Sequence, residues 1–573
     1  MKIIELLEHD NIDLGVVGSP SSSFEAIVDI KEVSEKSKLL GEMVCFRVKE
    51  GDNTVLVLGQ ITEIETKNRW HEEPSFKGII KRHGNLPNLS GVADNRIAKI
   101  NVQSSFVLGK ENSKAHKLAN SPSTGVQVKR INNPIMSELV KQYEDQLVSL
   151  GKAYDTDVKI PFWLKHFGKP SEGGGGDAYH IGVFGRTGSG KTTTAANMII
   201  GYAKNSKHMS ILILDPQEQF YEDNDVLPET KFKKKVIEAG MNYDKYKVPD
   251  KVALPNDPNL FCSLLSSYGF VRIAFNLKTT EKIELMAESI RRYLEGRMKG
   301  PKFSLGNQNP ETLLNDMIDR FNEKDDYAEN VYAKGQWLNI LKSRIAKMKN
   351  GDIDPKARDI WNRVLNYFSE HQKKPLLEII DEVVLNPKKL IILNISGRGS
   401  VRGMESIQTL FIKIIEDAIK DKGAELYADG KQANCLVVMD EAHRFISTYN
   451  FDQEIKELTT SIIDAVRTTR KYGIGYMFIT QTIDSLHEEI RRQMRIFAFG
   501  YGLTSGSEFN KIKDIINDNT GAKFYRSFID PSSNDKFPFM FYGPISPLSF
   551  TGAPLFLEMD GLISDYKSKV SAS

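Results

Sequence analysis

The sequence predicts an α/β fold in three parts: a small N-terminal β-barrel, a parallel sheet covered by helices, and a helical bundle inserted into the sheet domain. Short runs of alternating apolar and polar residues fill the first hundred residues, as is typical of antiparallel strands. Beyond residue 177 the apolar runs become continuous, which indicates strands buried on both faces. A stretch with helical periodicity separates these runs, and 573 residues suffice for two to four domains.

The composition excludes several classes of protein. Lys and Arg total 77 against 75 Asp and Glu, a net charge of +2, so any polyanion must be bound by a local cluster of cations. A 40% share of hydrophobic residues argues against wholesale disorder. Cys45, Cys262 and Cys435 lie far apart, which argues against a disulfide framework or a zinc site. No apolar stretch approaches the roughly 18 residues of a membrane span, so we expect a cytoplasmic protein without membrane contact.

The N-terminal barrel is predicted over residues 1–110. Residues 14–17, 43–48 and 54–61 read as short strands bounded by Gly, Asn and Ser, which is typical of a small barrel or sandwich. Residues 111–176 are expected to be a linker that carries an amphipathic helix at 135–150. The linker ends in a glycine-rich stretch at 171–177, which favours a flexible loop.

The sheet domain is predicted in two parts, residues 177–280 and 386–525. Its strands are expected at residues 181–184, 211–214, 271–275, 390–393 and 436–439. Between the two parts, residues 281–385 contain four amphipathic helices, which form an inserted bundle or, as an alternative, only cover the sheet. Residues 526–573 are expected to form a C-terminal brace.

Residues 185–192 match the pattern GxxxxGK[ST] directly after a predicted strand and before a helix-forming run. Glycines let backbone N–H groups surround phosphates, and the helix N-terminus adds a positive dipole. Lys191 would reach the β- and γ-phosphates, and Thr192 would bind Mg²⁺, so ATP and Mg²⁺ are the predicted cofactors. The predicted phosphate-binding residues are Gly185, Arg186, Thr187, Gly188, Ser189, Gly190, Lys191, Thr192 and Thr193.

Further candidates follow two other strands. Asp440 and Glu441 end a buried strand, where the first carboxylate would serve Mg²⁺ and the second would polarise the attacking water. Gln481 follows the strand at 474–479 and either contacts the γ-phosphate or satisfies the strand end. Arg467 and Arg470 end a helix, where the dipole favours cations; the alternative is an arginine finger that acts on a neighbouring subunit.

With these motifs together, the chain resembles the HerA family of hexameric DNA translocases, relatives of the FtsK-like motors. The similarity covers the HAS-barrel-like N-terminus, the Walker A loop at 185–192, an Asp-Pro strand end at 213–220, the Walker B segment at 440–445 and the region at 470–481. The resemblance implies a RecA-like P-loop ATPase core. At Gln217 and Glu218 the chain departs from the small or His/Gly-type residues usual in the family, which puts a role for Glu218 in doubt.

The resemblance also implies a function. Subunits would form a homo-hexamer that hydrolyses ATP at its interfaces and moves double-stranded DNA through a central channel, as a translocase or helicase. Glu441 would be the catalytic base, Gln481 the γ-phosphate sensor and Arg470 the finger, with Arg467 in reserve.

Such motors work with a nuclease of the NurA type in DNA repair, or with SIR2-like effectors in antiviral defence, and the barrel would be the docking surface. The alternative is a nucleotide-gated scaffold that assembles an effector without translocation. Lys231, Lys233, Lys234 and Lys235 form the densest basic cluster, which is either a DNA contact or a solvated face.

Overall fold

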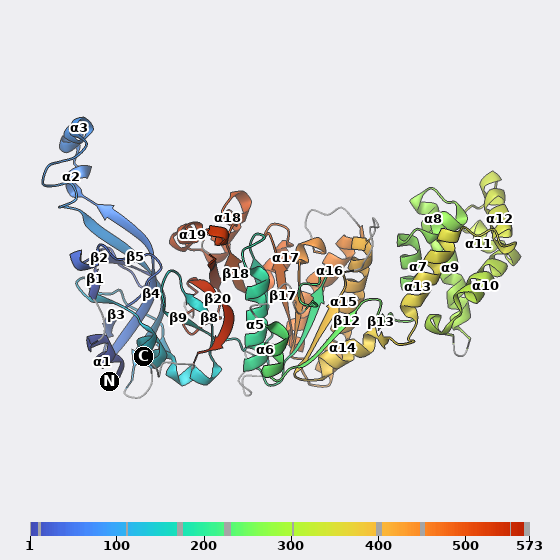
Figure 1. Ribbon diagram of the computed structural model, residues 1–573, viewed down its shortest axis with the longest axis horizontal. Helices are drawn as coiled ribbons and strands as arrows, with labels where there is room; N and C mark the ends of the chain where they lie inside the picture. Colours follow the sequence, from blue (N-terminus) through green and yellow to red (C-terminus); the bar gives the residue numbers. More distant parts are fainter. Residues whose placement is uncertain are drawn as a thin grey trace.

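The protein is elongated, with the barrel at one end, the sheet domain in the middle and a ring of helices at the other end (Figure 1). The computed structural model describes residues 2–9, 13–109, 113–168, 176–222, 231–300, 303–396, 404–446, 453–533, 535–549 and 552–566. Most of the predicted glycine-rich loop at 171–177 therefore lies outside the described residues. None of the described helices combines the length and the apolar character needed to cross a membrane.

The N-terminal domain is a sheet of seven strands that closes through the pairing of β2 with β5. Its order is β2-β1-β7-β3-β4-β5-β6, with β1 (Asp13–Val17), β2 (Glu25–Ile30), β3 (Met43–Glu50), β4 (Asn53–Lys67), β5 (Asn95–Leu108), β6 (Ser113–His116) and β7 (Gln127–Arg130). The three predicted strand segments fall in β1, β3 and β4. The predicted end at residue 110 is too early, because β7 fills the gap between β1 and β3 and pairs with both.

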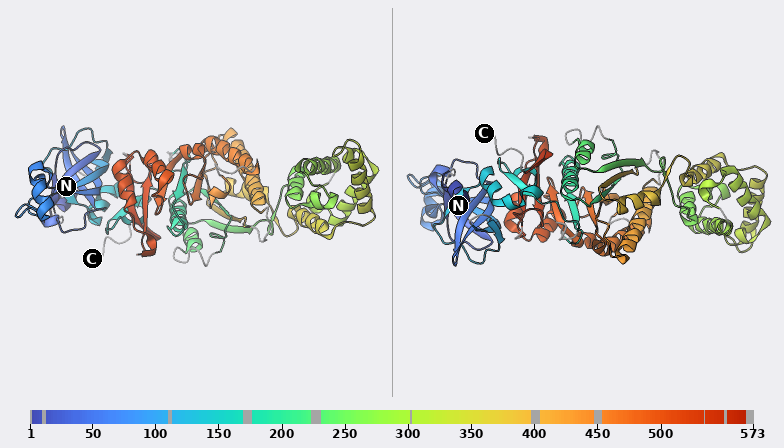
Figure 2. Two further views of the ribbon diagram at one scale, coloured as in Figure 1. Left: turned by 90° about the horizontal axis from the view of Figure 1, so that it is seen from above. Right: turned by 90° about the horizontal axis from the view of Figure 1, so that it is seen from below.

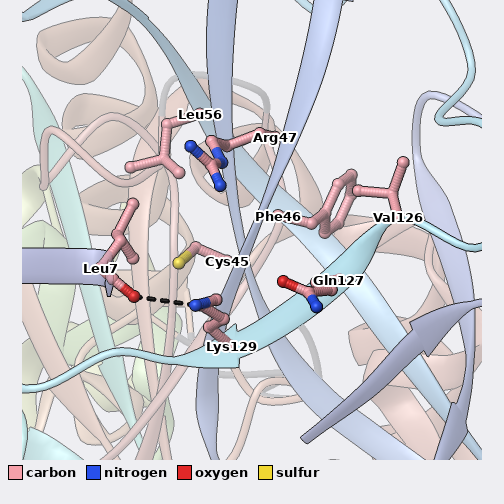
Figure 3. Close-up of a pocket in the computed structure, with 8 residues that line it drawn as sticks. All are labelled: Leu7, Cys45, Phe46, Arg47, Leu56, Val126, Gln127 and Lys129. Carbon is pink, nitrogen blue, oxygen red and sulfur yellow. Dashed lines mark hydrogen bonds between the residues drawn. The ribbon is translucent and has the colours of Figure 1, made fainter. Parts of the chain in front are cut away.

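The short N-terminal helix α1 (Lys2–His9) lies against the barrel. Lys129 Nζ donates a hydrogen bond of 2.8 Å to the carbonyl oxygen of Leu7. Beside this contact is a cavity of about 130 Å³, lined by apolar side chains together with Arg47 and Gln127 (Figure 3). Two further helices, α2 (Arg69–Glu72) and α3 (Pro74–His83), connect β4 to β5 and project away from the barrel (Figure 1).

The predicted helix at 135–150 is only half correct. Helix α4 (Asn133–Val140) is followed by a 3₁₀ turn and then by strands β8 (Val148–Ala153) and β9 (Lys159–Phe162). Strand β8 pairs with β20 (Leu555–Asp565), a segment four hundred residues away, and this pairing overrides the local helical spacing. A Cβ at Gly151 would lie 2.1 Å from the carbonyl oxygen of Glu558, so the two backbones meet at a distance that only glycine permits.

The central sheet has eleven strands in the order β12-β15-β11-β16-β17-β10-β18-β19-β20-β8-β9. Its parallel strands are β10 (His180–Phe184), β11 (Ser210–Asp215), β12 (Asn242–Lys247), β15 (Lys389–Asn394), β16 (Cys435–Met439), β17 (Ile474–Thr480) and β18 (Met494–Gly500). Successive residues such as Ile213 and Leu214 join two different buried clusters, so both faces are covered. Helices α5 (Lys191–Asn205) and α6 (Phe232–Glu238) pack on one face, and α14 (Leu376–Leu385), α15 (Met404–Ala428) and α16 (Gln453–Thr468) on the other.

The predicted strand at 271–275 is wrong, because this segment is helix α8 (Phe270–Phe275). Periodicity alone cannot distinguish a short buried strand from a buried helix. Here Phe270 packs on the ring of Trp361 at 5.2 Å, inside the helical domain. That domain comprises α7 (Pro258–Ser267), α8, α9 (Thr280–Met298), α10 (Pro310–Glu323), α11 (Asp326–Glu329), α12 (Gln336–Lys349) and α13 (Pro355–Phe368), so it begins before residue 281 and ends before 385.

The helices form a separate body and do not merely cover the sheet (Figure 2). A neck of two short parallel strands, β13 (Val252–Ala253) and β14 (Lys374–Pro375), joins the helical domain to the sheet domain.

The C-terminal segment was expected to form a brace, and its described part pairs with its own chain. Strand β19 (Phe537–Tyr542) pairs with β18, and β20 pairs with β19 and β8. Gln60 on β4 donates to the Phe556 carbonyl oxygen at 2.9 Å and accepts the Phe556 N–H at 3.1 Å. Gln103 on β5 donates to the carbonyl oxygen of Pro554 at 2.8 Å. The segment therefore fastens the sheet domain to the barrel of the same chain; residues 534, 550–551 and 567–573 lie outside the described part.

Candidate nucleotide-binding site

The glycine-rich loop joins the C-terminal end of β10 to the first turn of α5. Gly188 and Gly190 have φ values of 82° and 83°, a left-handed conformation that side chains disfavour. A Cβ at Gly190 would lie 2.8 Å from Cδ1 of Phe537, and one at Gly185 would lie 2.5 Å from Oγ of Ser189. The loop thus needs glycine at these positions, and its N–H groups and the start of α5 form an anion-binding turn.

Lys191 is the cation of this loop. It is 8% exposed, and its Nζ donates to the carbonyl oxygen of Arg186 at 2.9 Å. Burial lowers the pKa of Lys191, whereas the nearby carboxylates of Glu441 and Asp440 raise it. The structure therefore brings Lys191 close to the predicted acidic pair.

The strand order explains how these groups meet. Strand β17 lies between β10 and β16, and the three are parallel, so their C-terminal ends share one edge of the sheet. Asp440 and Glu441 follow β16, and Gln481 follows β17. Gln481 Nε2 lies 3.4 and 3.3 Å from the two carboxylate oxygens of Glu441 and donates to them.

Asp440 is buried and carries an oxygen without a protein partner. Its side chain is 2% exposed, and Oδ2 has no hydrogen-bond partner among the described residues. Burial, together with the nearby carboxylates of Asp215 and Glu441, raises the pKa of Asp440 to about 8. Such a carboxylate is stabilised when a cation comes beside it.

Glu441 has a left-handed backbone, with φ at 48°, which turns the chain sharply after β16. Nδ1 of His443 lies 3.2 Å from Glu441 Oε2, although this contact lacks hydrogen-bond geometry. Burial lowers the pKa of His443, which favours the neutral ring beside the carboxylate.

The residues present fit a magnesium nucleotide. The Thr192 hydroxyl and the Asp440 carboxylate are oxygen ligands of the kind Mg²⁺ prefers, and the hydroxyl of Ser189 is buried without a partner in the described structure. The described residues contain no group of three or more His, Cys, Asp or Glu that could hold a metal. Mg²⁺ usually takes one or two protein ligands and completes its shell with water and phosphate.

The two arginines lie at the opposite edge of the sheet. Arg467 ends α16 and pairs with Glu489; Arg470 lies in the following 3₁₀ turn and pairs with Asp177 at 2.8 Å. Both precede β17, whereas the glycine-rich loop follows β10. The structure therefore does not bring Arg467 or Arg470 to the phosphate loop of their own chain.

Sequence reasoning missed the contribution of the loop after β11. The buried carboxylate of Asp215 accepts backbone N–H groups at 2.8–3.2 Å from Gln217, Gln219, Phe220 and Tyr221. This loop places Oε1 of Gln219 2.7 Å from the Thr192 hydroxyl, which donates to it. The Asp-Pro strand end was the available signal, but which side chain of the loop would point at Thr192 depends on its folding.

Glu218, which departs from the family pattern, makes structural contacts in this chain. Its φ of 64° is a conformation that glycine adopts without cost. In this chain its carboxylate accepts hydrogen bonds of 2.8 Å from Lys247, Asn394 and Ser396. Lys247 and the two other donors lower the pKa of Glu218 to about 2. Glu218 thus fastens the loop to β12 and β15.

The fold and the loop define a P-loop ATPase, and comparison with known families gives the same result. Residues 178–415 match the family model of the helicase HerA central domain, and residues 391–498 match that of zonular occludens toxin (Zot). Residues 178–415 of this chain are therefore similar to the HerA central domain, in agreement with the predicted resemblance. No curated protein sequence matches the chain.

Three similar solved structures share little sequence with the chain. VirB4 of Thermoanaerobacter pseudethanolicus is 12% identical over 72% of this chain and 96% of its own, with a TM-score of 0.37. The genome packaging NTPase B204 from Sulfolobus turreted icosahedral virus 2, in complex with AMPPCP, is 10% identical over 67% and 98%, with a TM-score of 0.28. The pCW3 conjugation coupling protein TcpA is 10% identical over 90% and 87%, with a TM-score of 0.25.

Proposed function

We propose that the chain is an ATP-driven translocase of double-stranded DNA that acts as a homo-hexamer with ATP at the subunit interfaces. One observation carries the ATPase part: Lys191, Asp440 and Glu441 meet at one edge of the sheet, brought there from two strands that β17 separates. The similarity to the HerA central domain supports DNA as the substrate. The position of both arginines, away from the phosphate loop of their own chain, supports a ring in which they act on a neighbouring subunit.

Each side chain has a chemical task in this proposal. Lys191 and the loop N–H groups would bind the phosphates, and Thr192 and Asp440 would hold Mg²⁺, which would supply positive charge beside the phosphate oxygens. Glu441 accepts a proton from the attacking water. Gln481, which already donates to Glu441, is placed to sense the γ-phosphate and to orient that carboxylate.

Arg470, with Arg467 in reserve, would reach the site of a neighbouring subunit. Both arginines are part of ion pairs within their own chain, and their side chains are 26% and 48% exposed. Exposed ion pairs contribute little to stability, so these pairs can open towards a neighbour at small cost.

Two variants test the ATPase assignment. Glu441→Gln should keep ATP binding and lose turnover, whereas Lys191→Ala should lose binding. Native mass measurement with ATP and Mg²⁺ tests the ring: monomers that hydrolyse ATP at the full rate would contradict it. Normal turnover by Glu441→Gln would remove Glu441 from its role.

DNA contact is proposed for the basic cluster at the start of α6. Lys234 and Lys235 approach Glu238 at 3.9 and 3.1 Å, so part of their charge is already balanced. Lys231 precedes the helix. Reversing the charge of Lys231 and Lys234 should weaken salt-dependent duplex binding, and unchanged binding would place the DNA elsewhere.

The barrel is proposed as the docking surface for a nuclease or a SIR2-like effector, in DNA repair or antiviral defence. Capture from the native host, with and without residues 1–130, would identify the partner. A triplex displacement assay distinguishes the scaffold alternative from a translocase. A scaffold would hydrolyse ATP and bind its effector, but it would not displace a triplex-forming strand from duplex DNA. A translocase would displace that strand.

A further inference from the structure

We infer that Gln219 is a positioning residue, which holds the Thr192 hydroxyl in the orientation that Mg²⁺ requires. The inference rests on the proposed ATPase function. Thr192 Oγ1 donates to Gln219 Oε1 at 2.7 Å. A hydroxyl has one proton and two lone pairs, so a proton directed at Gln219 leaves lone pairs free for a metal.

Asp440 does not supply this acceptor. Asp440 Oδ2 has no hydrogen-bond partner among the described residues, although it is buried beside the loop. If the Thr192 proton were directed at Asp440, it would take up one of the acceptor positions of that carboxylate. Because Gln219 accepts the proton, both oxygens remain available to the same ion.

Gln219 is held by its backbone and by its side-chain amide. Its backbone N–H donates to Asp215 Oδ1 at 3.0 Å, within the group of four N–H groups on that buried carboxylate. Its Nε2 donates to Oε1 of Gln217 at 2.9 Å, which directs the amide oxygen, and not the amide nitrogen, towards Thr192. The Glu218 contact with Lys247, 2.8 Å long, fastens the intervening residue to β12.

The prediction concerns the gain in ATP affinity that Mg²⁺ provides. Loss of one hydrogen bond to a ligand group should reduce this gain about tenfold in Gln219→Leu. The affinity for ATP in EDTA, where Mg²⁺ is removed, should not change, because Gln219 is expected to act through Thr192 and the metal. Gln219→Glu keeps an acceptor oxygen at the same place and should restore the gain.

The experiment uses the full chain and a fluorescent ATP analogue, titrated in EDTA and in excess Mg²⁺, with Mn²⁺ binding to the ATP complex followed by electron paramagnetic resonance. Thr192→Val and the double variant Thr192→Val with Gln219→Leu complete a cycle, in which the second substitution should add nothing to the first. Gln432→Leu is the matched control: it removes a partly buried glutamine that donates to the carbonyl oxygen of Lys471 at the opposite edge of the sheet.

Four results are possible. A smaller Mg²⁺ gain in Gln219→Leu, rescued by Gln219→Glu, supports the inference. An unchanged gain overturns it. A parallel loss of affinity in EDTA and in Mg²⁺, with a lower melting temperature, also overturns it, because it indicates a purely structural role. If wild type binds no ATP at all, the proposed function fails and takes this inference with it.

Discussion

Replacing Glu416 by glutamine should stabilise the sheet domain above neutral pH and change its stability little in acid. Glu416 lies on α15 and is 1% exposed. Its Oε2 accepts a hydrogen bond of 2.7 Å from the hydroxyl of Tyr476 on β17, while Oε1 has no partner in the described structure. Burial raises the pKa of Glu416 to about 7, so the carboxylate form is costly in this place.

The effect of pH on the free energy of unfolding follows from the difference between the folded and unfolded pKa of Glu416. The folded-state pKa lies above the unfolded one, so the stability contribution is fully present below the unfolded pKa and is lost as pH rises through about 7. With an unfolded value of 4.5, the loss is about 3 kcal/mol at pH 8 and about 1 kcal/mol at pH 5. Glutamine keeps the acceptor for Tyr476 and carries no charge, so Glu416→Gln should recover most of that loss.

Hydrogen exchange followed by mass spectrometry measures the effect locally. The opening free energy of peptides from β17, corrected for intrinsic exchange, should rise in Glu416→Gln by about 2 kcal/mol more at pH 8 than at pH 5. Barrel peptides from β4 provide an internal reference. Glu425→Gln, on an exposed position of the same helix, is the control variant and should change nothing. A difference between Glu416→Gln and wild type that does not depend on pH would refute the reasoning.

Three further predictions concern the site and the domain junction. Gly190→Ala should weaken ATP binding more than Gly188→Ala, because both positions have a left-handed φ but only the Cβ at Gly190 would meet Phe537; equal losses in a binding titration would exclude the clash. Gln60→Leu should remove the acceptor of the buried Phe556 N–H, at a cost of about 1–3 kcal/mol, seen as faster hydrogen exchange in β20, and unchanged exchange would show that the barrel is held by other contacts. Arg470→Ala should keep ATP binding but lower hydrolysis in the assembled protein about a thousandfold or more; full hydrolysis would exclude Arg470 as the finger.

The motifs of the nucleotide site could be predicted because each is local. The loop at 185–192 needs glycines and a lysine at fixed spacing, and the structure gives left-handed φ values to Gly188 and Gly190. The pair at Asp440 and Glu441 ends a continuous apolar run, which is why its strand was found. The barrel strands were found from their short apolar runs, although β3 and β4 are buried on consecutive residues, because neighbours such as Val57 and Leu58 join two different buried clusters.

Other features depend on distant partners. The apolar run at 271–275 is part of a helix that packs on Trp361 through Phe270, and residues 148–153 became a strand because they pair with β20. The strand order, which inserts β17 between β10 and β16, places Gln481 against Glu441. No local pattern specifies which strands will be neighbours.

Local motifs of the chain predict a phosphate-binding loop, an acidic pair at a strand end and a resemblance to the HerA family, because each motif requires particular residues at short spacing. Which of these groups meet depends on the tertiary fold. It turned Gln219 towards Thr192 and joined the C-terminal strands to the protein's own barrel through Gln60. The physical reason is that hydrogen bonds and packing act between atoms that are close in space, whatever their separation along the chain.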